Sequence, residues 1–277
     1  MKIIGIGDSV VDYYKDQNQI YPGGNVVNVP VFAKWSGAEQ TSYLGIVGTD
    51  IAGDHLLDCL HQEGIDTSRV RRVQGPTGEA VVTLNESGDR VFVGTNKETR
   101  VTSLVSLSLN QEDLEYISNY QLVHAAISIN NGIERELPKL ADMPIAFDFS
   151  SNEFWTKEYL EQVCPYLSYA FLSGSNLSDL EVIDVIEFVA KLGVNVVGVT
   201  RGELPAVFYH KGKRFEQKTV SKDVVDTMGA GDSFIASFLT HFHSSNDIQG
   251  SLQAAAQFAS EVCGYYGAFG YGLKVEW

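Results

Sequence analysis

Short apolar runs alternate along most of the chain with segments whose apolar residues recur at helical spacing. The apolar runs are suited to buried strands and occupy residues 3–7, 42–47, 122–127, 145–149, 169–172 and 194–200. The segments with helical spacing lie between them, at residues 25–35, 52–62 and 179–191. Strand alternating with helix indicates βαβ units with right-handed crossovers. The sequence therefore predicts an α/β fold in which helices flank a central, mainly parallel sheet, with ligands at the carboxyl ends of its strands.

One region departs from this alternation. Residues 77–84 and 90–95 contain Val and Phe, as strands do, and the turn-forming pentapeptide at residues 85–89 separates them. These features predict a β-hairpin. Together with residues 12–21, the hairpin could form a small sheet that projects from the main body, although a plain surface hairpin accounts for the same pattern.

The most informative segment is residues 226–234, with the sequence DTMGAGDSF. The apolar residues 224–225 before it could end a strand, and the apolar residues after it recur at helical spacing. The small residues therefore lie at a helix N-terminus, where backbone amides lack intrahelical partners and the helix dipole attracts anions. We predict that the amides of Gly229, Ala230 and Gly231 form an anion hole for phosphate.

Asp232 stands directly beside this predicted anion hole. A carboxylate there repels phosphate, which is costly unless the carboxylate takes a proton from an attacking hydroxyl group. The segment is therefore interpreted as a phosphoryl-transfer site with Asp232 as the general base. A glycine-rich turn followed by an Asp that only caps the helix is the alternative.

Taken as a whole, residues 226–234 resemble the C-terminal signature of the PfkB, or ribokinase-like, carbohydrate kinases. In that family the Asp at the position of Asp232 is the catalytic base, and the preceding amides form the anion hole. The resemblance implies a ribokinase-like α/β fold, ATP as the phosphoryl donor and Mg²⁺ bound with it. It also implies a single kinase domain over residues 1–277, in which residues 12–21 and 77–99 form a β-sheet lid over the sugar.

A second block, residues 23–28 with the sequence GGNVVN, opens a predicted helix. Paired glycines bring backbone amides close to a ligand, and Asn28 offers a donor and acceptors to a hydroxyl group. With residues 44–50, the block resembles the N-terminal signature of the same family, in which residues at the positions of Gly24 and Asn28 hold sugar hydroxyls. Asp12 falls where these kinases keep a sugar-binding Asp; a strand-end carboxylate that faces water is the alternative.

Pro30 departs from the family pattern at this block. It lies inside the helix predicted at residues 25–35, where family members often have a small residue. Because proline has no amide hydrogen, it should remove one backbone hydrogen bond and kink the helix. Pro30 therefore puts in question whether the geometry near Asn28 follows the family pattern.

The nucleotide-binding residues are predicted from the strand at 194–200. Thr200 and Gly202 resemble the Thr-x-Gly nucleotide loop of the family, which places them beside the ATP phosphates, although Pro205 stands where a glycine is common. Residues 252–266 carry small or apolar residues at helical spacing, a face that borders adenine in the family. Core packing explains that face equally well.

The metal ligands are unknown from the sequence. Ser173 and Asn176 stand in the region where the family has an Asn-x-x-Glu motif that acts on the magnesium shell. Asp148 and Asp226 are carboxylates that could replace this motif through water, because Mg²⁺ keeps several waters and needs few protein ligands. This replacement is a hypothesis.

The charge balance limits the partners that we expect. The chain has 277 residues, with 20 Lys and Arg against 35 Asp and Glu, and a net charge of −15. This charge repels nucleic acid and anionic membranes, so neither is expected to bind. Nucleotide phosphates must therefore be attracted locally, by backbone amides, a divalent cation or a few basic side chains.

The cysteines and the apolar runs indicate the cellular setting. Cys59, Cys164 and Cys263 are widely separated and form no Cys-x-x-Cys pair, so we expect buried reduced thiols rather than zinc ligands or disulfides. The run at residues 3–7 is too short for a signal sequence, and no segment approaches the roughly twenty apolar residues that span a bilayer. These features predict a protein of the reducing cytoplasm.

Other nucleotide and metal chemistries lack the residue spacing that they require. A dinucleotide-binding fingerprint would need a third glycine after Gly5 and Gly7, where Val10 stands, and no Walker-type P-loop occurs. His241 and His243 are two apart on a predicted helix, so they point to different faces and are poor joint metal ligands.

Within the family, the chain is most similar to the fructoselysine 6-kinases, through residues 123–127, 146–150 and 226–236. This similarity implies phosphorylation of fructoselysine, a sugar-amine, at its sixth carbon. A kinase for another small carbohydrate, such as fructose, ribose or 2-keto-3-deoxygluconate, stays open. So does a regulator that binds sugar or nucleotide without catalysis.

The predicted lid raises two further expectations. Its charged residues Glu86, Asp89, Arg90 and Glu98 are candidates for reading the non-sugar end of the substrate, although charged hairpin tips are usually only solvated. The sequence does not reveal the oligomeric state, although an exposed face of the hairpin could pair with its copy in a homodimer through the lid.

Overall fold

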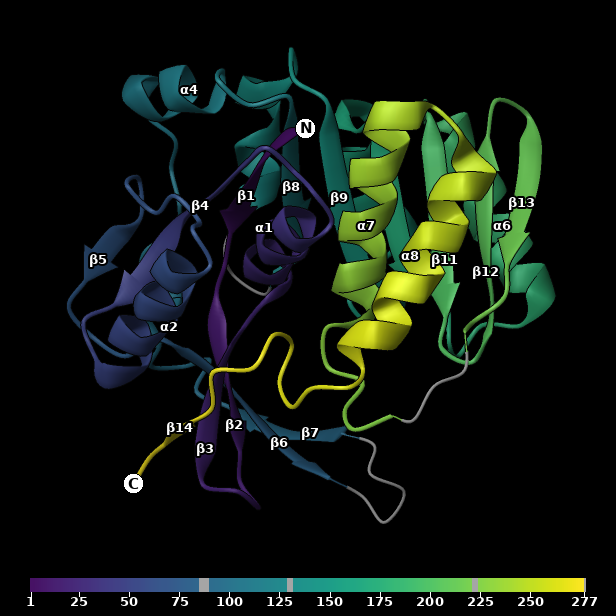
Figure 1. Ribbon diagram of the computed structural model, residues 1–277. Helices are drawn as coiled ribbons and strands as arrows, with labels where there is room; N and C mark the ends of the chain where they lie inside the picture. The colour runs from purple at the N-terminus through teal and green to yellow at the C-terminus, as the bar shows by residue number, and fades with distance from the viewer. Residues whose placement is uncertain (85–89, 129–131, 221–223, 277) are drawn as a thin grey trace.

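The computed structural model describes residues 1–84, 90–128, 132–220 and 224–276. Its strands form a large sheet and a small sheet (Figure 1). The large sheet consists of β1 (Lys2–Gly7), β4 (Gln40–Gly48), β5 (Arg71–Val73), β8 (Leu122–Ala126), β9 (Ile145–Ser151), β10 (Tyr169–Ser173), β11 (Val196–Arg201), β12 (Leu204–His210) and β13 (Lys213–Gln217). The small sheet consists of β2 (Val10–Tyr14), β3 (Gln19–Gly23), β6 (Gly78–Leu84), β7 (Arg90–Thr95) and β14 (Leu273–Lys274).

The strand order of the large sheet is β13-β12-β11-β10-β9-β8-β1-β4-β5. Its strands from β11 to β5 pair in parallel, as the alternation of strands and helices predicts. β12 and β13 extend the sheet in antiparallel pairing and were not predicted from the sequence. The predicted α/β fold is therefore confirmed, with an antiparallel extension at one edge.

Helices cover both faces of the large sheet. The helices are α1 (Asn25–Trp35), α2 (Ile51–Gln62), α3 (Val101–Leu104), α4 (Gln111–Ile117), α5 (Lys157–Val163), α6 (Asp179–Lys191), α7 (Ala230–Ser245) and α8 (Ile248–Val262). One buried apolar cluster packs α1, α2, α7 and α8 against the sheet, and a second packs α4, α5 and α6 against its other face. Ile3 belongs to the first cluster and its neighbour Ile4 to the second, because successive strand side chains point to opposite faces.

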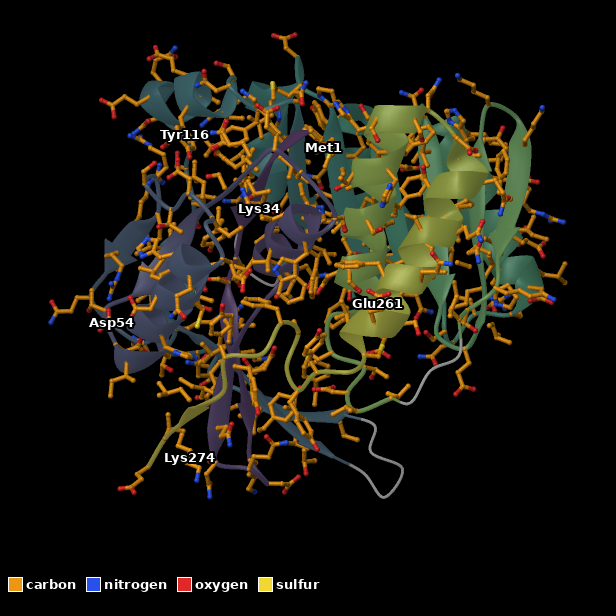
Figure 2. The ribbon with its side chains drawn as sticks, viewed as in Figure 1. Met1, Lys34, Asp54, Tyr116, Glu261 and Lys274 are labelled. Atoms are coloured by element: carbon orange, nitrogen blue, oxygen red, sulfur yellow. The ribbon has the colours of Figure 1, made fainter. Side chains whose placement is uncertain are left out.

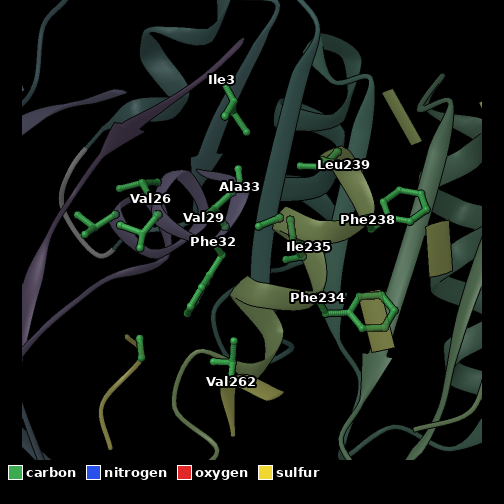
Figure 3. Close-up of a cluster of buried hydrophobic side chains, with 14 of the residues drawn as sticks. Ile3, Val26, Val29, Phe32, Ala33, Phe234, Ile235, Phe238, Leu239 and Val262 are labelled. Carbon is green, nitrogen blue, oxygen red and sulfur yellow. The ribbon is translucent and has the colours of Figure 1, made fainter. Parts of the chain in front are cut away.

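The cluster that contains α1 and α7 holds the two helices that later supply the candidate site. Figure 3 shows Phe32 and Ala33 of α1 on the side of α7 that carries Ile235. Phe234 and Phe238 of α7 point the other way, and their rings lie 5.9 Å and 5.0 Å from that of Phe208 in β12. Helix α7 is therefore apolar on two sides, which fixes its position beside α1 and against β12 of the sheet.

Pro30 does not interrupt α1, which continues from Asn25 to Trp35. Proline has no amide hydrogen, so Pro30 cannot donate to the carbonyl of Val26 one turn earlier. That carbonyl oxygen lies against Gly5 of β1, where an added Cβ would stand 2.0 Å from it and 2.8 Å from Cγ of Pro30. The missing side chain of Gly5 thus lets α1 approach β1 closely at the turn that contains Pro30.

The small sheet has the order β14-β3-β2-β6-β7 and lies beyond the carboxyl ends of the parallel strands (Figure 1). Figure 2 shows Met1 on the large-sheet side of the molecule and Lys274 in the small sheet. Strands β6 and β7 pair antiparallel, as the predicted hairpin requires, and β2 pairs with β6 in parallel. The predicted turn at 85–89, which includes Glu86 and Asp89, lies outside the described residues.

Two local expectations differ from the structure. Residues 224–225 are exposed and belong to no strand, because the amides of Val225 and Asp226 donate to the carbonyl of Cys263, at 2.8 and 3.1 Å, and not to a sheet neighbour. The helical segment expected at 252–266 ends at Val262, and Tyr266 lies beyond the helix. The carbonyl of Cys263, directly after α8, therefore holds the segment that leads into α7.

The three cysteines are buried and reduced. Burial raises the pKa of the Cys59 and Cys164 thiols to about 12, so both stay protonated at neutral pH. Within the described part of the chain, no helix has the length and apolar character needed to cross a membrane.

Candidate active site

Helix α7 begins at the carboxyl ends of the large-sheet strands, on the side where the small sheet lies (Figure 1). Gly229 is its N-cap, and its φ of 76° is a left-handed conformation that favours glycine. A Cβ at Gly229 would also stand 2.9 Å from Cβ of Ala268. A Cβ at Gly231 would meet no described atom within 4 Å, and Gly231 is exposed. The turn therefore has open space where an anion could approach the first amides of the helix.

Of the three amides predicted to form the anion hole, that of Ala230 donates to the carbonyl of Thr227 at 3.2 Å. This is at the long end of the range for an amide hydrogen bond. A phosphate oxygen would compete with that carbonyl for the Ala230 amide. The positive end of the α7 dipole favours the anion in this competition.

Asp232 lies in the first turn of α7 and is partly exposed. Its Oδ2 accepts a hydrogen bond of 2.7 Å from Nδ2 of Asn28 in α1. Asn28 is buried, and its Oδ1 has no hydrogen-bond partner among the residues that the structure describes. A buried acceptor without a donor costs free energy, and a sugar hydroxyl that donates to it would remove that cost.

Asp148, in β9, is a second carboxyl group of the site. Nδ2 of Asn25 donates to its Oδ2 at 2.6 Å, and the amide of Ser150 donates to its Oδ1 at 2.8 Å. Burial and the nearby charge of Asp232 raise the pKa of Asp148 to about 7. Two carboxyl groups close together resist simultaneous ionisation, so the charge of Asp232 disfavours the loss of the proton from Asp148.

The predicted sugar-binding residues lie next to one another at the start of α1. Asp12 of β2 is buried, and its carboxylate lies against Gly23, where a Cβ would stand 2.2 Å from Oδ2. Gly24 is the N-cap of α1 with a φ of 102°, and its carbonyl accepts from the amide of Asn28 at 2.9 Å. These contacts connect Asp12, through Gly23 and Gly24, with the Asn28 that holds Asp232.

Asp226 is fully buried below the start of α7. Its Oδ2 accepts from the hydroxyl of Tyr14 in β2 and from the amide of Gly267 at 3.0 Å, and its Oδ1 accepts from the amide of Met228 at 2.9 Å. Both carboxylate oxygens are thus used within the protein. Asp226 ties the small sheet and the C-terminal segment to the turn that precedes Asp232.

This arrangement argues against Asp226 as a metal ligand. Asp148 likewise accepts a hydrogen bond at each oxygen. Among the described residues, no group of three or more His, Cys, Asp or Glu side chains could hold a metal ion.

The predicted nucleotide residues lie at the end of β11. The carbonyl of Thr200 accepts from the amide of Gly174 at 2.7 Å, and Gly202 has a φ of 60°. Arg201 between them is directed to the start of α6, where it pairs with Asp179 at 2.8 Å. The basic side chain of this loop is therefore engaged in a structural contact and not in the site.

A pocket of about 630 Å³ lies away from these residues, beside Tyr169 and Val196, the first residues of β10 and β11. It contains no residue that the sequence singled out. Because ligands of open α/β sheets bind at the carboxyl ends of the strands, this pocket at the amino ends is not the candidate site.

The structure brings Asp12, Gly24, Asn28 and Asp232 together, whereas no described hydrogen bond joins Thr200 or Gly202 to them. Sequence reasoning missed Asn25, although it stands inside the GGNVVN block, and it assigned no role to Tyr14. The position of Asn25 directly after two glycines at a helix start was a usable signal. Nothing in the local sequence indicated that Tyr14 would reach Asp226.

Comparison with known proteins identifies the family of this chain. The family model described as pfkB family carbohydrate kinase matches residues 3–270. Fructosamine kinase FrlD of Bacillus subtilis (strain 168) is 45% identical over 98% of this chain and 94% of its own length. Fructoselysine 6-kinase of Escherichia coli (strain K12) is 32% identical over 95% of this chain and 98% of its own length.

Solved structures show the same fold. Fructokinase with bound ATP from Xylella fastidiosa superposes with a TM-score of 0.79 at 20% identity, over 97% of this chain and 94% of that one. Ribokinase of Arabidopsis thaliana, complexed with ribose and ATP, also has a TM-score of 0.79, at 21% identity, over 96% of this chain and 93% of that one. The fold and the matches define a phosphotransferase that acts on a sugar hydroxyl. The chain belongs to the PfkB family of carbohydrate kinases, which confirms the fold class and the family predicted from the sequence.

Proposed function

We propose that this kinase transfers the terminal phosphoryl group of ATP to the sixth-carbon hydroxyl of fructoselysine, with Asp232 as the base. The observation that carries the proposal is the hydrogen bond from Asn28 to Asp232 beside the open start of α7. This arrangement supports a site in which the Asp232 carboxylate takes the proton of the sugar hydroxyl while the N-terminus of α7 binds the phosphoryl group that the hydroxyl attacks. The similarity to fructosamine kinase FrlD and fructoselysine 6-kinase supports the substrate.

In the proposed reaction, Asp232 accepts the proton of the attacking sugar hydroxyl. The hydroxyl oxygen forms a bond to the terminal phosphorus while the bond from that phosphorus to the bridging oxygen breaks, and ADP leaves. The amides of Gly229, Ala230 and Gly231 stabilise the charge on the phosphoryl oxygens during transfer. Asp12, Gly24 and Asn28 hold the sugar, and the buried Oδ1 of Asn28 accepts from one of its hydroxyls.

The nucleotide must bind against the field of a chain whose net charge is −15. The helix dipole of α7 and its first amides supply local attraction, and Thr200 and Gly202 are the proposed contacts along the polyphosphate. Mg²⁺ is proposed to neutralise and orient the phosphates when it is bound. No step above depends on a particular protein ligand for it.

A substrate panel tests the proposal. Purified protein with ATP and Mg²⁺ is assayed for ADP release with fructoselysine, fructose, ribose and 2-keto-3-deoxygluconate, and kcat/KM is compared. We expect fructoselysine to have the highest value. A higher kcat/KM for one of the plain sugars would replace the proposed substrate, and tight ATP binding without turnover on any of them would favour a non-catalytic regulator.

We also propose that residues 1–277 form one kinase domain, with residues 12–21 and 77–99 as the lid over the sugar. Strand β7 is last in the small sheet and exposes Val91, Phe92 and Val93 by 42%, 59% and 53%. Three neighbouring apolar residues on an edge strand support a homodimer through the lid. The three reduced thiols support a cytoplasmic location.

A further inference from the structure

A pocket of about 360 Å³ begins at the residues proposed to hold the sugar. Gly24, Asn25 and Val26 at the start of α1 form one part of its wall, and Val10 of β2 forms another. Its volume lies within the range typical of small-molecule sites. The pocket does not include Asp232, so it extends the candidate site away from the reacting acid.

The pocket contains side chains of both charges. Arg100 is buried, and its guanidinium lies 3.4 Å from Oδ2 of Asp8, which also accepts from the hydroxyl of Ser128 at 2.9 Å. These two charges therefore compensate each other. Lys97 and Glu134 also line the pocket, and no salt bridge between described residues involves either of them. One cation and one anion are thus available to a ligand.

Apolar side chains complete the wall. Phe154, exposed by 47%, and Tyr159 both line the pocket. Burial and the charge of Glu134 raise the pKa of Tyr159, so its ring stays neutral. A ligand that fits this lining carries one positive group, one negative group and an aliphatic segment.

A hexose alone has none of these three features, whereas the amino-acid end of a fructose–lysine adduct has them all. In such a ketose-amine the amine is attached at the first carbon, at the opposite end of the sugar from the sixth. If the sixth-carbon hydroxyl meets Asp232, the amine substituent must leave the sugar on the side away from Asp232, which is where the pocket lies.

We propose that this pocket binds the amino-acid end of the substrate, with Lys97 at the α-carboxylate, Glu134 at the α-ammonium, and Phe154 and Tyr159 along the aliphatic chain. This inference rests on the proposed function. It assigns recognition of the non-sugar end to residues that follow β7, β8 and β9, and not to Glu86 or Asp89 of the turn predicted from the sequence.

Three adducts of fructose separate the two charges. All three share the secondary amine that joins them to the sugar. Beyond it, the lysine adduct through Nε carries the α-carboxylate and the α-ammonium, the 6-aminohexanoate adduct carries a carboxylate alone, and the cadaverine adduct carries an ammonium alone. For each, kcat/KM is measured by ADP release with the wild type, Lys97→Gln and Glu134→Gln. Glu161→Gln, at an exposed position of α5 and outside the pocket lining, is the matched control.

Lys97→Gln should lower kcat/KM for the lysine and 6-aminohexanoate adducts and leave kcat/KM for the cadaverine adduct unchanged. The decrease should be only about 3- to 10-fold, because Lys97 is exposed and water partly screens its ion pair with the substrate carboxylate. Glu134→Gln should lower it about 10-fold for the lysine and cadaverine adducts only, since Glu134 is partly buried. Lys97→Arg should restore the preference for the carboxylate. Thermal unfolding should show equal stability for all variants.

The outcomes separate this inference from the proposed function. If the wild type phosphorylates the lysine adduct but both variants act equally on all three adducts, or lose activity uniformly, the pocket assignment is overturned and the proposed function stands. If the wild type acts on none of the adducts but does act on a plain sugar, the proposed substrate fails and the pocket assignment fails with it.

Discussion

The side-chain amide of Asn28 donates a 2.7 Å hydrogen bond to Asp232, although the two residues are 204 positions apart in the chain. The bond joins the N-terminal part of α1 to the first turn of α7, the two helices that share one apolar cluster. An uncharged donor orients the carboxylate without neutralising it, as a salt bridge would. Asp232 can therefore remain a base whose lone pairs face a defined direction.

Replacement of Asp232 by Asn should lower kcat roughly 10²–10⁴-fold while sugar and ATP still bind, because only proton removal is lost. ADP release measures kcat, and titration calorimetry measures binding of each ligand. Asp184→Asn on the exposed face of α6 is the matched control and should keep wild-type turnover. Unchanged kcat in Asp232→Asn would remove this residue from the mechanism.

The raised pKa of Asp148 should make stability fall as pH rises. In the folded protein this pKa is about 7, whereas the ordinary pKa of an aspartate side chain is 3.8. Between about pH 4 and pH 7 the folded state therefore binds the proton more tightly than the unfolded state, so the free energy of unfolding decreases with pH. Asp148→Asn should remove this contribution and stabilise the protein at pH 8 by on the order of 2 kcal/mol.

Urea unfolding of the wild type and Asp148→Asn at pH 4, 6 and 8 tests this prediction. The two proteins should be nearly equal in stability at pH 4, where the wild-type carboxyl is protonated, and diverge as the pH rises. A constant difference across the three pH values would show that Asp148 ionises normally.

Tyr14→Phe should destabilise the protein by about 1–3 kcal/mol, because a buried carboxylate loses one of its three donors. Tyr13→Phe is the control on the same strand, since the Tyr13 hydroxyl contacts only the surface residue Asn18 at 3.2 Å. Equilibrium unfolding in urea compares them. Equal stability of the two variants would mean that the bond to Asp226 contributes little.

Replacement by alanine should have opposite effects on stability at Gly229 and at Gly231, two glycines of the same turn. Gly229→Ala should cost about 1–3 kcal/mol, because φ is positive there and the new Cβ meets Ala268. Gly231→Ala should stabilise α7 slightly, because the new Cβ meets open space in the described structure. It should nevertheless lower kcat/KM for ATP by about 10- to 10²-fold, because the methyl group occupies the space through which the phosphate reaches the helix amides. Thermal unfolding and ATP-dependent kinetics measure both. A Gly231→Ala enzyme with wild-type kcat/KM would place the phosphates elsewhere.

Several helices were predictable because the sequence signals for them are local. Residues 25–35 and 179–191 form helices with the predicted bounds, and α6 begins at a capping box between Ser178 and Glu181. Strands β12 and β13 were missed because Pro205 stands inside the first and Lys213–Gln217 is largely polar, as edge strands often are.

The site was predictable only in part, for a related reason. Asp232 and the glycines before it carry a signal within nine residues, and so does Asn28 with the glycine pair. The links between them are tertiary. No spacing rule connects Asn25 with Asp148 or Tyr14 with Asp226, because those pairs depend on how distant segments of the chain pack together.

The contact between Gly5 and the Val26 carbonyl limits how this chain can vary. The strand position admits no side chain, and the helix position opposite it, Pro30, supplies no amide that would draw the carbonyl away. A side chain at Gly5 would therefore disturb the approach of α1 to β1, and with it the placement of Asn25 and Asn28. In related sequences, a residue larger than glycine at this strand position should occur only where the backbone of the first helix lies farther from the strand.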